Sequence, residues 1–464
     1  SYAFDILIEI YRESGWSDRD AARSILENNL YGLDIDNRAA QLACFAVMMK
    51  ARQYNRRILS SNTKLHIMAI QESSFMTDEL IRFIANKDVS LWHDLKELQI
   101  LFSNAKEYGS IISVPKLDYN SLYSRIDEIN AQYSENILEL AFKADAVDFL
   151  TPVIQQAEIL SEKYEVVVTN PPYMNRYSPR LKSFIEEQYA DYKGDLFSVF
   201  MFRNLSFCKD DGYSGFMTPN VWMYIKSFEK LRSTYINQKS ITSFLLLAKG
   251  AFYKEATVDL CCFIVSNTKG LEGSFIRLEQ YKGDMERQKD ALLNMEQLIE
   301  DGNIFYRHMD QFSLIPGNPL AFWISDSLLS TFKQKSIDSL TISKAGIVSG
   351  NDALFLRVWY EIAFSNITMN AENFDDQRAY KWVPINKGGA FRRYYGNHEY
   401  IINIYDLWNS PDKVNESVRR SEPGFYFKKA MTWSYVTTGK SSFRYTNNKT
   451  SATAAPNLFF NNDE

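Results

Sequence analysis

The sequence predicts an α/β chain built on a doubly wound sheet and followed by a loop-rich C-terminal region. Two stretches carry this prediction. Residues 29–36 read as a short buried strand that ends in acids, and residues 38–58 then read as a helix rich in Ala, Leu and Met. Residues 164–168 form a second apolar run, and a helix is expected after it at about 195–208. An alternation of helices and strands is typical of such a sheet.

Further strands and helices are expected downstream of this second run. A turn signal at residues 210–212 precedes a strand at 213–218, and a helix follows near 227–237. The strands expected at 241–247 and 258–266 are separated by a short link, which suggests a hairpin at the edge of the sheet.

The remaining segments divide the chain into domains. We expect one domain from residues 1–58 and 136–267, interrupted by a mainly helical, polar insertion at 59–135. The composition becomes charged and mixed over 268–342, which reads as a linker or crossover. Residues 343–464 are loop-rich, aromatic and basic, and we expect a separate, incomplete domain there.

Charge is distributed unevenly along the 464 residues. The whole chain carries a net charge of -5, which argues against a surface coated uniformly for nucleic acid. Residues 378–445 hold 12 Lys or Arg against 5 Asp or Glu, a local charge of +7, so the rest of the chain carries -12. This asymmetry is typical of a polyanion-binding module beside an acidic domain, although a basic structural surface would look the same.

Several classes of site find no support in the composition. The four Cys and four His are scattered without the spacing of a metal site, a disulfide framework or a catalytic triad, and the cysteines read as buried thiols in a reducing cytoplasm. No apolar run is long enough to cross a membrane. The chain opens at Ser1 in a helical pattern and ends in loop-like sequence, so it reads as a piece cut from a longer protein.

Asn170-Pro171-Pro172-Tyr173 ends the apolar run at 164–168 and is the most informative motif. A strand that stops at two prolines passes into a rigid loop, and this loop carries one amide and one aromatic ring. An amide oxygen, carbonyls near proline and a ring face suit the gripping of a flat ring that bears an amine. A simple turn that closes a strand is the alternative interpretation.

Acidic residues supply a second group of candidates. Asp34 at the end of the first strand could accept both hydroxyls of a ribose, while Asp36 is well placed to cap the helix that follows. Ile35 could lie against an adenine face. Asp145, which precedes Ala146, could accept from an exocyclic amine, or it could be an ordinary solvated acid.

These motifs resemble, in their order, the S-adenosylmethionine-dependent adenine-N6 DNA methyltransferases of the gamma arrangement. The residues that carry this likeness are Asp34-Ile35-Asp36, Ala144-Asp145, Asn170-Pro171-Pro172-Tyr173, Asp195-Leu196-Phe197 and Gly212 to Pro219. More closely, the chain is similar to the PglX-type methyltransferases of BREX phage-defence systems. That likeness rests on Ser24 to Asp36, Lys50 to Tyr54, Asn351-Asp352 with Phe355 to Arg357, and Lys381-Trp382 with Asn386 to Gly389.

The resemblance implies a fold, a cofactor and a set of site residues. The fold would be a Rossmann-like class I methyltransferase domain with a helical insertion and a C-terminal α+β target-recognition domain. Asn170, Pro171, Pro172 and Tyr173 would be catalytic, with a flipped adenine stacked between Tyr173 and Phe252. The methyl donor would be S-adenosylmethionine, bound through Asp34, Ile35, Asp145 and Ala146.

The family's glycine-rich turn after the first strand is not found in this sequence. We therefore expect this chain alone to lack the first strand and to bind the cofactor weakly or not at all.

The resemblance also implies double-stranded DNA as the partner, with other BREX-system proteins as possible further partners. Clusters of cations beside aromatic residues mark the expected DNA contacts at Arg392, Arg393, Lys428 and Lys429. Two rival functions stay open: a methyltransferase that acts on RNA or protein, and a catalytically silent DNA-binding scaffold with the same fold.

Overall fold

A computed structural model describes most of the chain, in two compact units that meet between Leu329 and Ser330. The described residues are 1–252, 258–369, 371, 381–410, 412, 416–420, 422–437, 439–447, 450–451 and 455–460. Residues 253–255 of the expected hairpin link and the final residues 461–464 thus lie outside the description.

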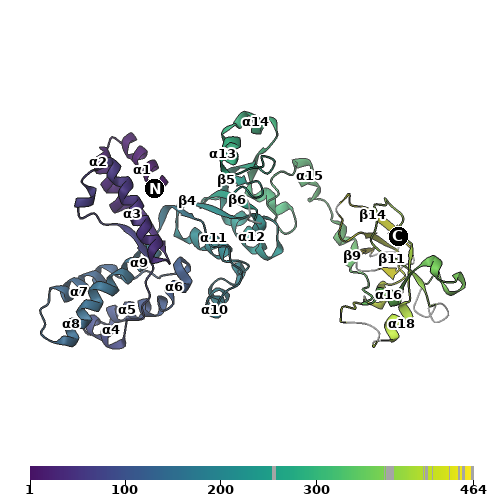
Figure 1. Cartoon of the computed structure of the whole chain (residues 1–464), viewed down its shortest axis with the longest axis horizontal. Helices are drawn as coiled ribbons and strands as arrows, with labels where there is room; N and C mark the ends of the chain where they lie inside the picture. The colour runs from purple at the N-terminus through teal and green to yellow at the C-terminus, as the bar shows by residue number, and fades with distance from the viewer. Residues whose placement is uncertain are drawn as a thin grey trace. The chain divides into compact units, whose positions relative to one another are not determined.

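A six-stranded mixed sheet forms the centre of the first unit, and the helices α11, α12 and α10 accompany it (Figure 1). Its strand order is β3-β4-β6-β5-β7-β8, in which β3 pairs parallel with β4 and β5 pairs parallel with β7. The strands are β3 (Tyr164–Thr169), β4 (Cys208–Pro219), β5 (Ser240–Leu246), β6 (Leu260–Ser266), β7 (Glu272–Arg277) and β8 (Ile304–His308). The helices nearest in sequence are α10 (Pro179–Gln188), α11 (Leu196–Phe207), α12 (Glu229–Gln238), α13 (Met285–Leu293) and α14 (Met295–Glu300).

One phenylalanine from each of four adjacent strands forms a row through the core of this sheet. Phe216 lies opposite Phe263, which lies opposite Phe244, which lies opposite Phe275, with ring centroids 5.2, 5.7 and 5.6 Å apart. All four are buried. Much of the high aromatic content therefore stabilises the sheet by packing.

Two expectations for this sheet were wrong. β5 and β6 do pair antiparallel, but they lie inside the sheet, because β7 and β8 extend it further. Both of these strands come from residues 268–342, which were expected to be a linker or crossover. Short strands separated by charged helices show no alternation strong enough to be recognised in sequence.

A small two-stranded parallel sheet lies towards the N-terminus, with β1 paired to β2 in the register Tyr31↔His66 to Asp34↔Ala69. α1, α2 and α3 accompany it and share a core that includes Phe4 and Ile25. β2 falls within the stretch expected to be mainly helical. The elements are α1 (Tyr2–Glu13), α2 (Asp18–Ser24), the π-helix η1 (Ile25–Asn29), β1 (Tyr31–Asp34), α3 (Asn37–Tyr54), the 3-10 helix η2 (Ile58–Ser60) and β2 (His66–Ala69).

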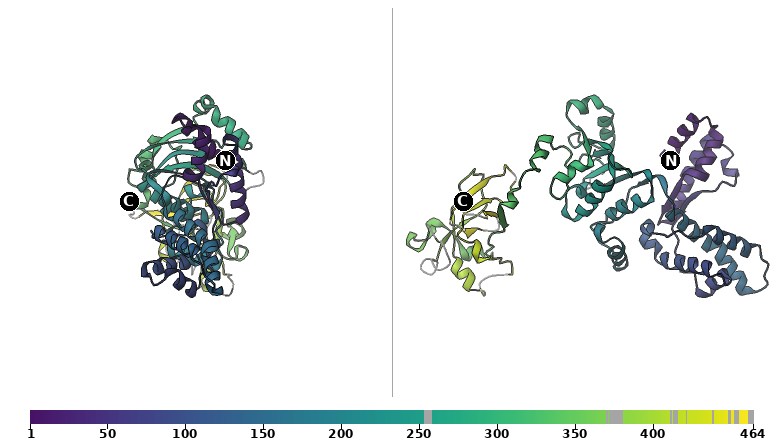
Figure 2. Two further views of the ribbon diagram at one scale, coloured as in Figure 1. Left: turned by 90° about the vertical axis from the view of Figure 1, so that its left-hand side faces the viewer. Right: turned by 180° about the vertical axis from the view of Figure 1, so that it is seen from behind.

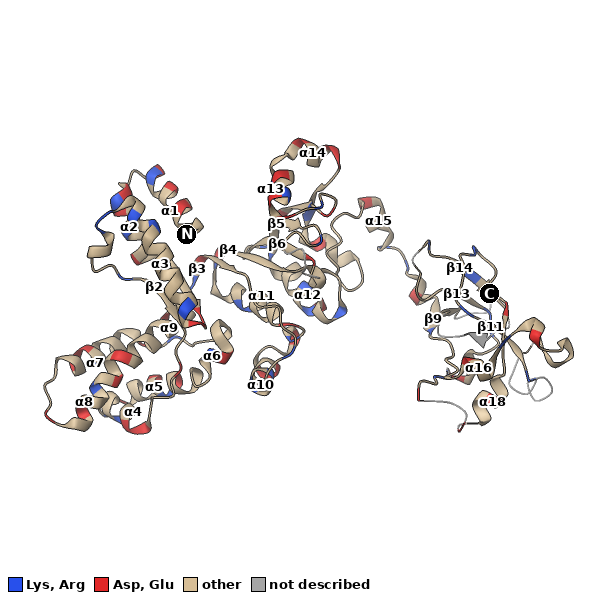
Figure 3. Cartoon of the chain, in the orientation of Figure 1, with Lys and Arg blue, Asp and Glu red and all other residues tan. Residues whose placement is uncertain are grey.

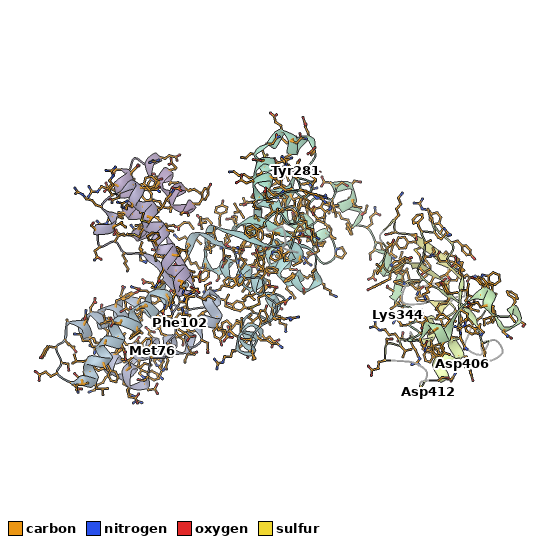
Figure 4. All side chains as sticks on the ribbon, viewed as in Figure 1. Met76, Phe102, Tyr281, Lys344, Asp406 and Asp412 are labelled. Carbon is orange, nitrogen blue, oxygen red and sulfur yellow. The ribbon has the colours of Figure 1, made fainter. Side chains whose placement is uncertain are left out.

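Helices dominate residues 78–161, and Figure 2 shows them gathered in one bundle. Met76 and Phe102, both labelled in Figure 4, are buried in the core of this bundle. Its elements are α4 (Asp78–Ala85), α5 (Val89–Leu101), α6 (Ala105–Tyr108), the 3-10 helix η3 (Gly109–Ile111), α7 (Tyr119–Ala131), α8 (Ile137–Ala144), the π-helix η4 (Asp145–Leu150) and α9 (Thr151–Ser161). None of the helices in the described parts of the chain is long and apolar enough to cross a membrane.

The second unit is built on two four-stranded sheets, ordered β10-β12-β11-β15 and β14-β13-β16-β9. Its strands are β9 (Thr341–Lys344), β10 (Leu356–Val358), β11 (Val383–Asn386), β12 (Tyr400–Ile402), β13 (Ala430–Trp433), β14 (Phe443–Thr446), β15 (Thr450–Ser451) and β16 (Asn457–Phe460). Its α-helices include α16 (Asp352–Phe355) and α18 (Ile404–Asn409), and α15 (Asp326–Thr331) spans the boundary between the units.

Candidate active site

The Asn170-Pro171-Pro172-Tyr173 motif lies where β3 ends, beside the end of β4. The two strands run parallel with Thr169 opposite Phe216, so Asn170 comes next to Met217. The Tyr173 hydroxyl donates a shared hydrogen bond to Asn170 Oδ1 at 3.0 Å and to the Met217 carbonyl at 3.1 Å. Asn170 is exposed. Its amide oxygen is thus held at the carboxyl edge of the sheet, where open α/β sheets bind ligands.

Tyr173 combines a packed ring with a neutral hydroxyl. Its ring meets Phe197 edge-on with centroids 6.3 Å apart, and 39% of the residue is exposed. Burial raises the pKa of Tyr173 to about 12, so the hydroxyl keeps its proton at ordinary pH. The ring therefore remains accessible for stacking while the hydroxyl acts as a donor.

Asp195 fastens the loop after the motif to the start of α11. Its Oδ1 accepts from the Met174 backbone N–H at 2.9 Å and from that of Phe197 at 3.3 Å, which caps the helix. In return the Leu196 N–H donates to the Met174 carbonyl at 2.9 Å. Burial raises the pKa of Asp195 above the ordinary value, so the fold holds a partly desolvated carboxyl here. The sequence predicts Asp195 only as part of a motif and does not predict this role, which depends on the tertiary path of the loop.

Asp34 and Asp36 occupy the loop between β1 and α3, which we call the acid loop (residues 34–37). Asp36 accepts from the backbone N–H groups of Arg38 at 2.7 Å and Ala39 at 3.0 Å, which confirms the predicted helix cap. Asp34 is exposed at the strand end, and its Oδ1 accepts from the Asp36 N–H at 2.8 Å. Ile35 is 52% exposed. Residues 34–37 are all exposed, and because Asp36 caps the helix, Asp34 and Ile35 are the candidates of this loop for a ligand.

The other residues predicted to bind the cofactor or base lie on separate elements. Asp145 begins η4 in the helical bundle, and Ala146 is fully buried in the core of that bundle. Ala146 therefore has no exposed surface, backbone included, through which it could meet a ligand. Phe252 is 47% exposed in the segment between β5 and β6. Its stacking on a base stays a prediction.

The predicted DNA contacts gather at one strand pair of the second unit. Lys428 and Lys429 immediately precede β13, while Arg392 and Arg393 precede Tyr394, which exchanges backbone hydrogen bonds with β14 at 2.9 and 2.8 Å. All four cations are exposed, and Figure 3 marks the Lys and Arg positions of this unit in blue. β13 pairs antiparallel with β14, so both clusters flank the same two strands.

No cluster of three or more His, Cys, Asp or Glu side chains within the described residues could hold a metal ion.

Comparison with known proteins finds similarity to methyltransferases. Residues 28–252 match the model of the Eco57I restriction-modification methylase family. The adenine-specific methyltransferase BrxX of Escherichia coli O9:H4 (strain HS) is 32% identical over 470 aligned residues, which cover 96% of this chain and 38% of that protein. The adenine-specific methyltransferase PglX of Lacticaseibacillus casei (strain Zhang) is 32% identical over 460 residues, with the same two shares. Over nearly its whole length, the chain is similar to the PglX-type methyltransferases.

The resemblance inferred from the motifs is thereby confirmed, and so is a methyltransferase fold. The chain spans 38% of the length of these two PglX-type relatives. Among solved structures, a nuclease-deletion mutant of the Type ISP restriction-modification enzyme LlaGI in complex with a DNA substrate mimic aligns over 98% of this chain and 38% of its own, with 10% identity and a TM-score of 0.42. A TM-score of this size supports no inference about the fold or function of this chain.

Proposed function

We propose that this chain is part of an enzyme that transfers a methyl group from S-adenosylmethionine to the N6 of an adenine flipped out of duplex DNA. The observation that carries the proposal is the position of Asn170 at the carboxyl edge of the sheet, with its amide oxygen fastened by Tyr173. The names of the relatives, adenine-specific methyltransferases, support the choice of adenine.

Asn170, Pro171 and Tyr173 would act by positioning the adenine and stabilising the charge that develops on it. The N6 lone pair of adenine is conjugated into the ring, which makes the nitrogen a poor nucleophile. Asn170 Oδ1 and the Pro171 carbonyl would accept its two hydrogens and favour the pyramidal nitrogen. Because an amide oxygen has two lone pairs, Asn170 can accept from the amine while Tyr173 still donates to it. Dipoles aimed at the developing positive charge then lower the barrier, and the ring of Tyr173 supplies one stacking face.

The exposed groups of the acid loop fit the sugar end of the cofactor. Asp34 offers an exposed carboxylate at a strand end, whose Oδ1 accepts from the Asp36 N–H, and Ile35 offers an apolar side chain beside it. When bound, S-adenosylmethionine would supply the electrophilic methyl group. Asp145 would accept from the cofactor's adenine, while a contact with Ala146 would require the bundle to open around this fully buried residue.

In the part of the chain that the structure describes, the two-stranded sheet and the six-stranded sheet each have an unpaired edge at which a further strand could pair. Within the described residues, β1 pairs only with β2 and β3 pairs only with β4, so each has one unpaired edge. The rings of Tyr31 on β1 and Tyr164 on β3 lie 5.2 Å apart, and Val166 and Val168 are 61% and 73% exposed. We propose that a parallel strand from outside residues 1–464 pairs with these edges and leads into the turn that holds the methionine end of the cofactor.

The test is Asn170→Ala in the full-length protein. Loss of a donor or acceptor that acts on the reacting group costs about 10²–10³-fold in rate, so we expect N6-methyladenine in duplex DNA to fall by about that factor. Asn120→Ala, which alters an exposed asparagine of α7, is the matched control and should methylate normally. Retained binding of S-adenosylhomocysteine would show that Asn170→Ala is folded. Unchanged methylation would contradict the proposal and favour a silent scaffold.

The substrate class needs a separate measurement. The wild-type full-length protein should label adenine in duplex DNA when it is supplied with radioactive S-adenosylmethionine. Labelling of RNA or protein with no label in duplex DNA would establish the rival class of methyltransferase. We further propose that the mark protects host DNA in a phage-defence system of the BREX type, with other proteins of that system as partners.

We propose that the exposed cations beside β13 and β14 contact the phosphates of the duplex. Each lost phosphate contact should lower the slope of log binding constant against log salt by about one. A Lys428→Ala and Lys429→Ala double variant should therefore flatten the slope by about two in a fluorescence-anisotropy titration. The matched control removes two exposed lysines outside these sheets, Lys333 and Lys335. Equal slopes in the variant and the wild type would exclude these contacts.

A further inference from the structure

Residues 104–112, which we call the bridging segment, contact both halves of the candidate site. They comprise helix α6, the 3-10 helix η3 and one residue at each end. On one side, half-buried Lys106 donates from its Nζ to the Ile35 carbonyl at 2.8 Å and to Asn37 Oδ1 at 2.8 Å. Two charge-assisted bonds therefore hold the acid loop at both sides of Asp36.

Gly109 brings the same segment close against the acid loop. Its φ is +61°, in the left-handed region, and a Cβ there would lie 3.2 Å from Ile35 Cγ2. A side chain at this position would have to push Ile35 aside. The close approach shows that the segment packs on the acid loop along its length and not through Lys106 alone.

The opposite side of the bridging segment holds α10, the helix that begins just after the Tyr173 loop. Tyr108 stacks on Phe184 with ring centroids 4.2 Å apart and planes 12° apart. Arg180 Nη1 donates to Asn104 Oδ1 at 3.2 Å, and the Ser178 hydroxyl donates to Glu107. Ser178 also caps α10. The loop from Asn170 to Ser178 is thus held at Met174 by Asp195 and at Ser178 by the bridging segment.

The C-terminal end of the bridging segment packs against α10 and α11. Ile111 is fully buried against residues of α10 and α11, and its carbonyl accepts from the Tyr189 hydroxyl at 2.5 Å. The next carbonyl, of Ile112, accepts from Arg203 Nη2 at 2.8 Å. A continuous set of packed and hydrogen-bonded contacts therefore runs from the acid loop to the helix that carries Asp195.

We propose that the bridging segment sets the position of the methyl donor relative to the target amine, and that Lys106 is the positioning residue for the acid loop. This inference rests on the proposed function, in which Asp34 holds the cofactor and Asn170 the base. Methyl transfer needs the two reactants aligned to within a fraction of an ångström, and two loops on separate sheets cannot keep that alignment without a rigid connection. Lys106 and Tyr108 supply the two ends of that connection.

The experiment compares variants of the full-length protein by their affinity for S-adenosylhomocysteine without DNA, measured by calorimetry. Lys106→Met keeps the apolar stem and loses the donors, so we expect the Kd to rise about tenfold. Lys106→Arg retains a cation and donors and should recover most of the affinity. Lys116→Met, which changes an exposed lysine of the same insertion, should bind as the wild type does.

Tyr108→Ala tests the other end. We expect its Kd for S-adenosylhomocysteine to stay within twofold of the wild type, while kcat falls about tenfold. A fluorescent adenine analogue at the target position of the DNA should be unstacked less often, and its fluorescence reports this. If Lys106→Met lowers the melting temperature, Asn37→Ala provides the check, because it removes one acceptor of the same lysine. That variant should raise the Kd about threefold.

The outcomes distinguish the positioning role of the bridging segment from the proposed methyltransferase function on which it rests. A wild-type protein that neither binds S-adenosylhomocysteine nor methylates DNA contradicts the proposed function. An active wild type together with a Lys106→Met variant that binds within twofold of it contradicts the positioning role alone. Equal rises in Kd for Tyr108→Ala and Lys106→Met would also overturn it, because they would indicate general loosening.

Discussion

The loop that carries Asn170 is held by residues close to it in the fold, whereas the acid loop is held by a lysine 71 residues away from Ile35 in sequence. At the first loop, Tyr173, Asp195 and the end of β4 supply the contacts. At the acid loop, the Asp36 cap is the local contact and Lys106 the distant one. The proposed base-gripping half is therefore held mainly by β4 and Asp195, with the bridging segment at the far end of its loop. The proposed cofactor half depends on Lys106 of the insertion.

This difference predicts where substitutions separate catalysis from cofactor binding. Changes around Asn170 should lower kcat and leave cofactor affinity alone, because Tyr173, Asp195 and β4 hold the motif without contacting the acid loop. Changes at the acid loop should do the reverse. A variant that changed kcat and the Kd for the cofactor by equal factors would show that the Asn170 loop and the acid loop are less independent than their contacts indicate.

Apart from Asn170→Ala, the largest expected effect is that of Asp195→Ala. It removes the acceptor of the Met174 N–H and the cap of α11, so the Tyr173 loop loses its fixed position. A displacement of about 1 Å at a reacting group can cost about 10²-fold, and we expect kcat to fall by that factor in a steady-state methylation assay.

Asp191→Ala, at an exposed acid just before α11, is the control and should be fully active. The Kd of Asp195→Ala for S-adenosylhomocysteine should match that of the wild type. A kcat within threefold of the wild type would show that the loop keeps its position without the carboxylate.

The next effect in size is that of Asp34→Ala at the acid loop. Loss of a carboxylate that accepts from two ribose hydroxyls should raise the Kd for S-adenosylhomocysteine about 30-fold, as expected for charge-assisted bonds. At saturating S-adenosylmethionine, kcat should stay within about threefold. Asp127→Ala on α7 is the matched control because it removes an exposed carboxylate of the insertion. An unchanged Kd would move the ribose contact to another residue.

The same contrast explains which parts of the site could be predicted from sequence. β1 and β3 each end in polar residues at the edge of a sheet, and an apolar run that stops at such residues is a local signal. The Asp36 cap was predictable for the same reason, because it depends on its next three residues.

Contacts between distant segments left no such signal. Lys106 lies on a helix of four residues in a polar stretch, and nothing local distinguishes it from the exposed Lys116. Strands β7 and β8 lie where the sequence predicts a linker, because both strands alternate weakly and β7 finds its parallel partner in β5. Asp195 was noticed as a motif, yet its bond to Met174 depends on the tertiary path of the loop.

The smallest expected effect belongs to Tyr173→Phe, which keeps the ring and removes the hydroxyl. Asn170 Oδ1 then loses one neutral hydrogen bond, worth about 1 kcal/mol, so kcat should fall about fivefold. The kcat of Tyr173→Ala should fall much further, because that variant also lacks a stacking face. Burial holds the pKa of Tyr173 at about 12, so the wild-type hydroxyl stays protonated beyond pH 10. The pH–rate profiles of the wild type and Tyr173→Phe should therefore run parallel from pH 7 to 10. A divergence that begins below pH 10 would show that the hydroxyl titrates during the reaction and does more than hold Asn170.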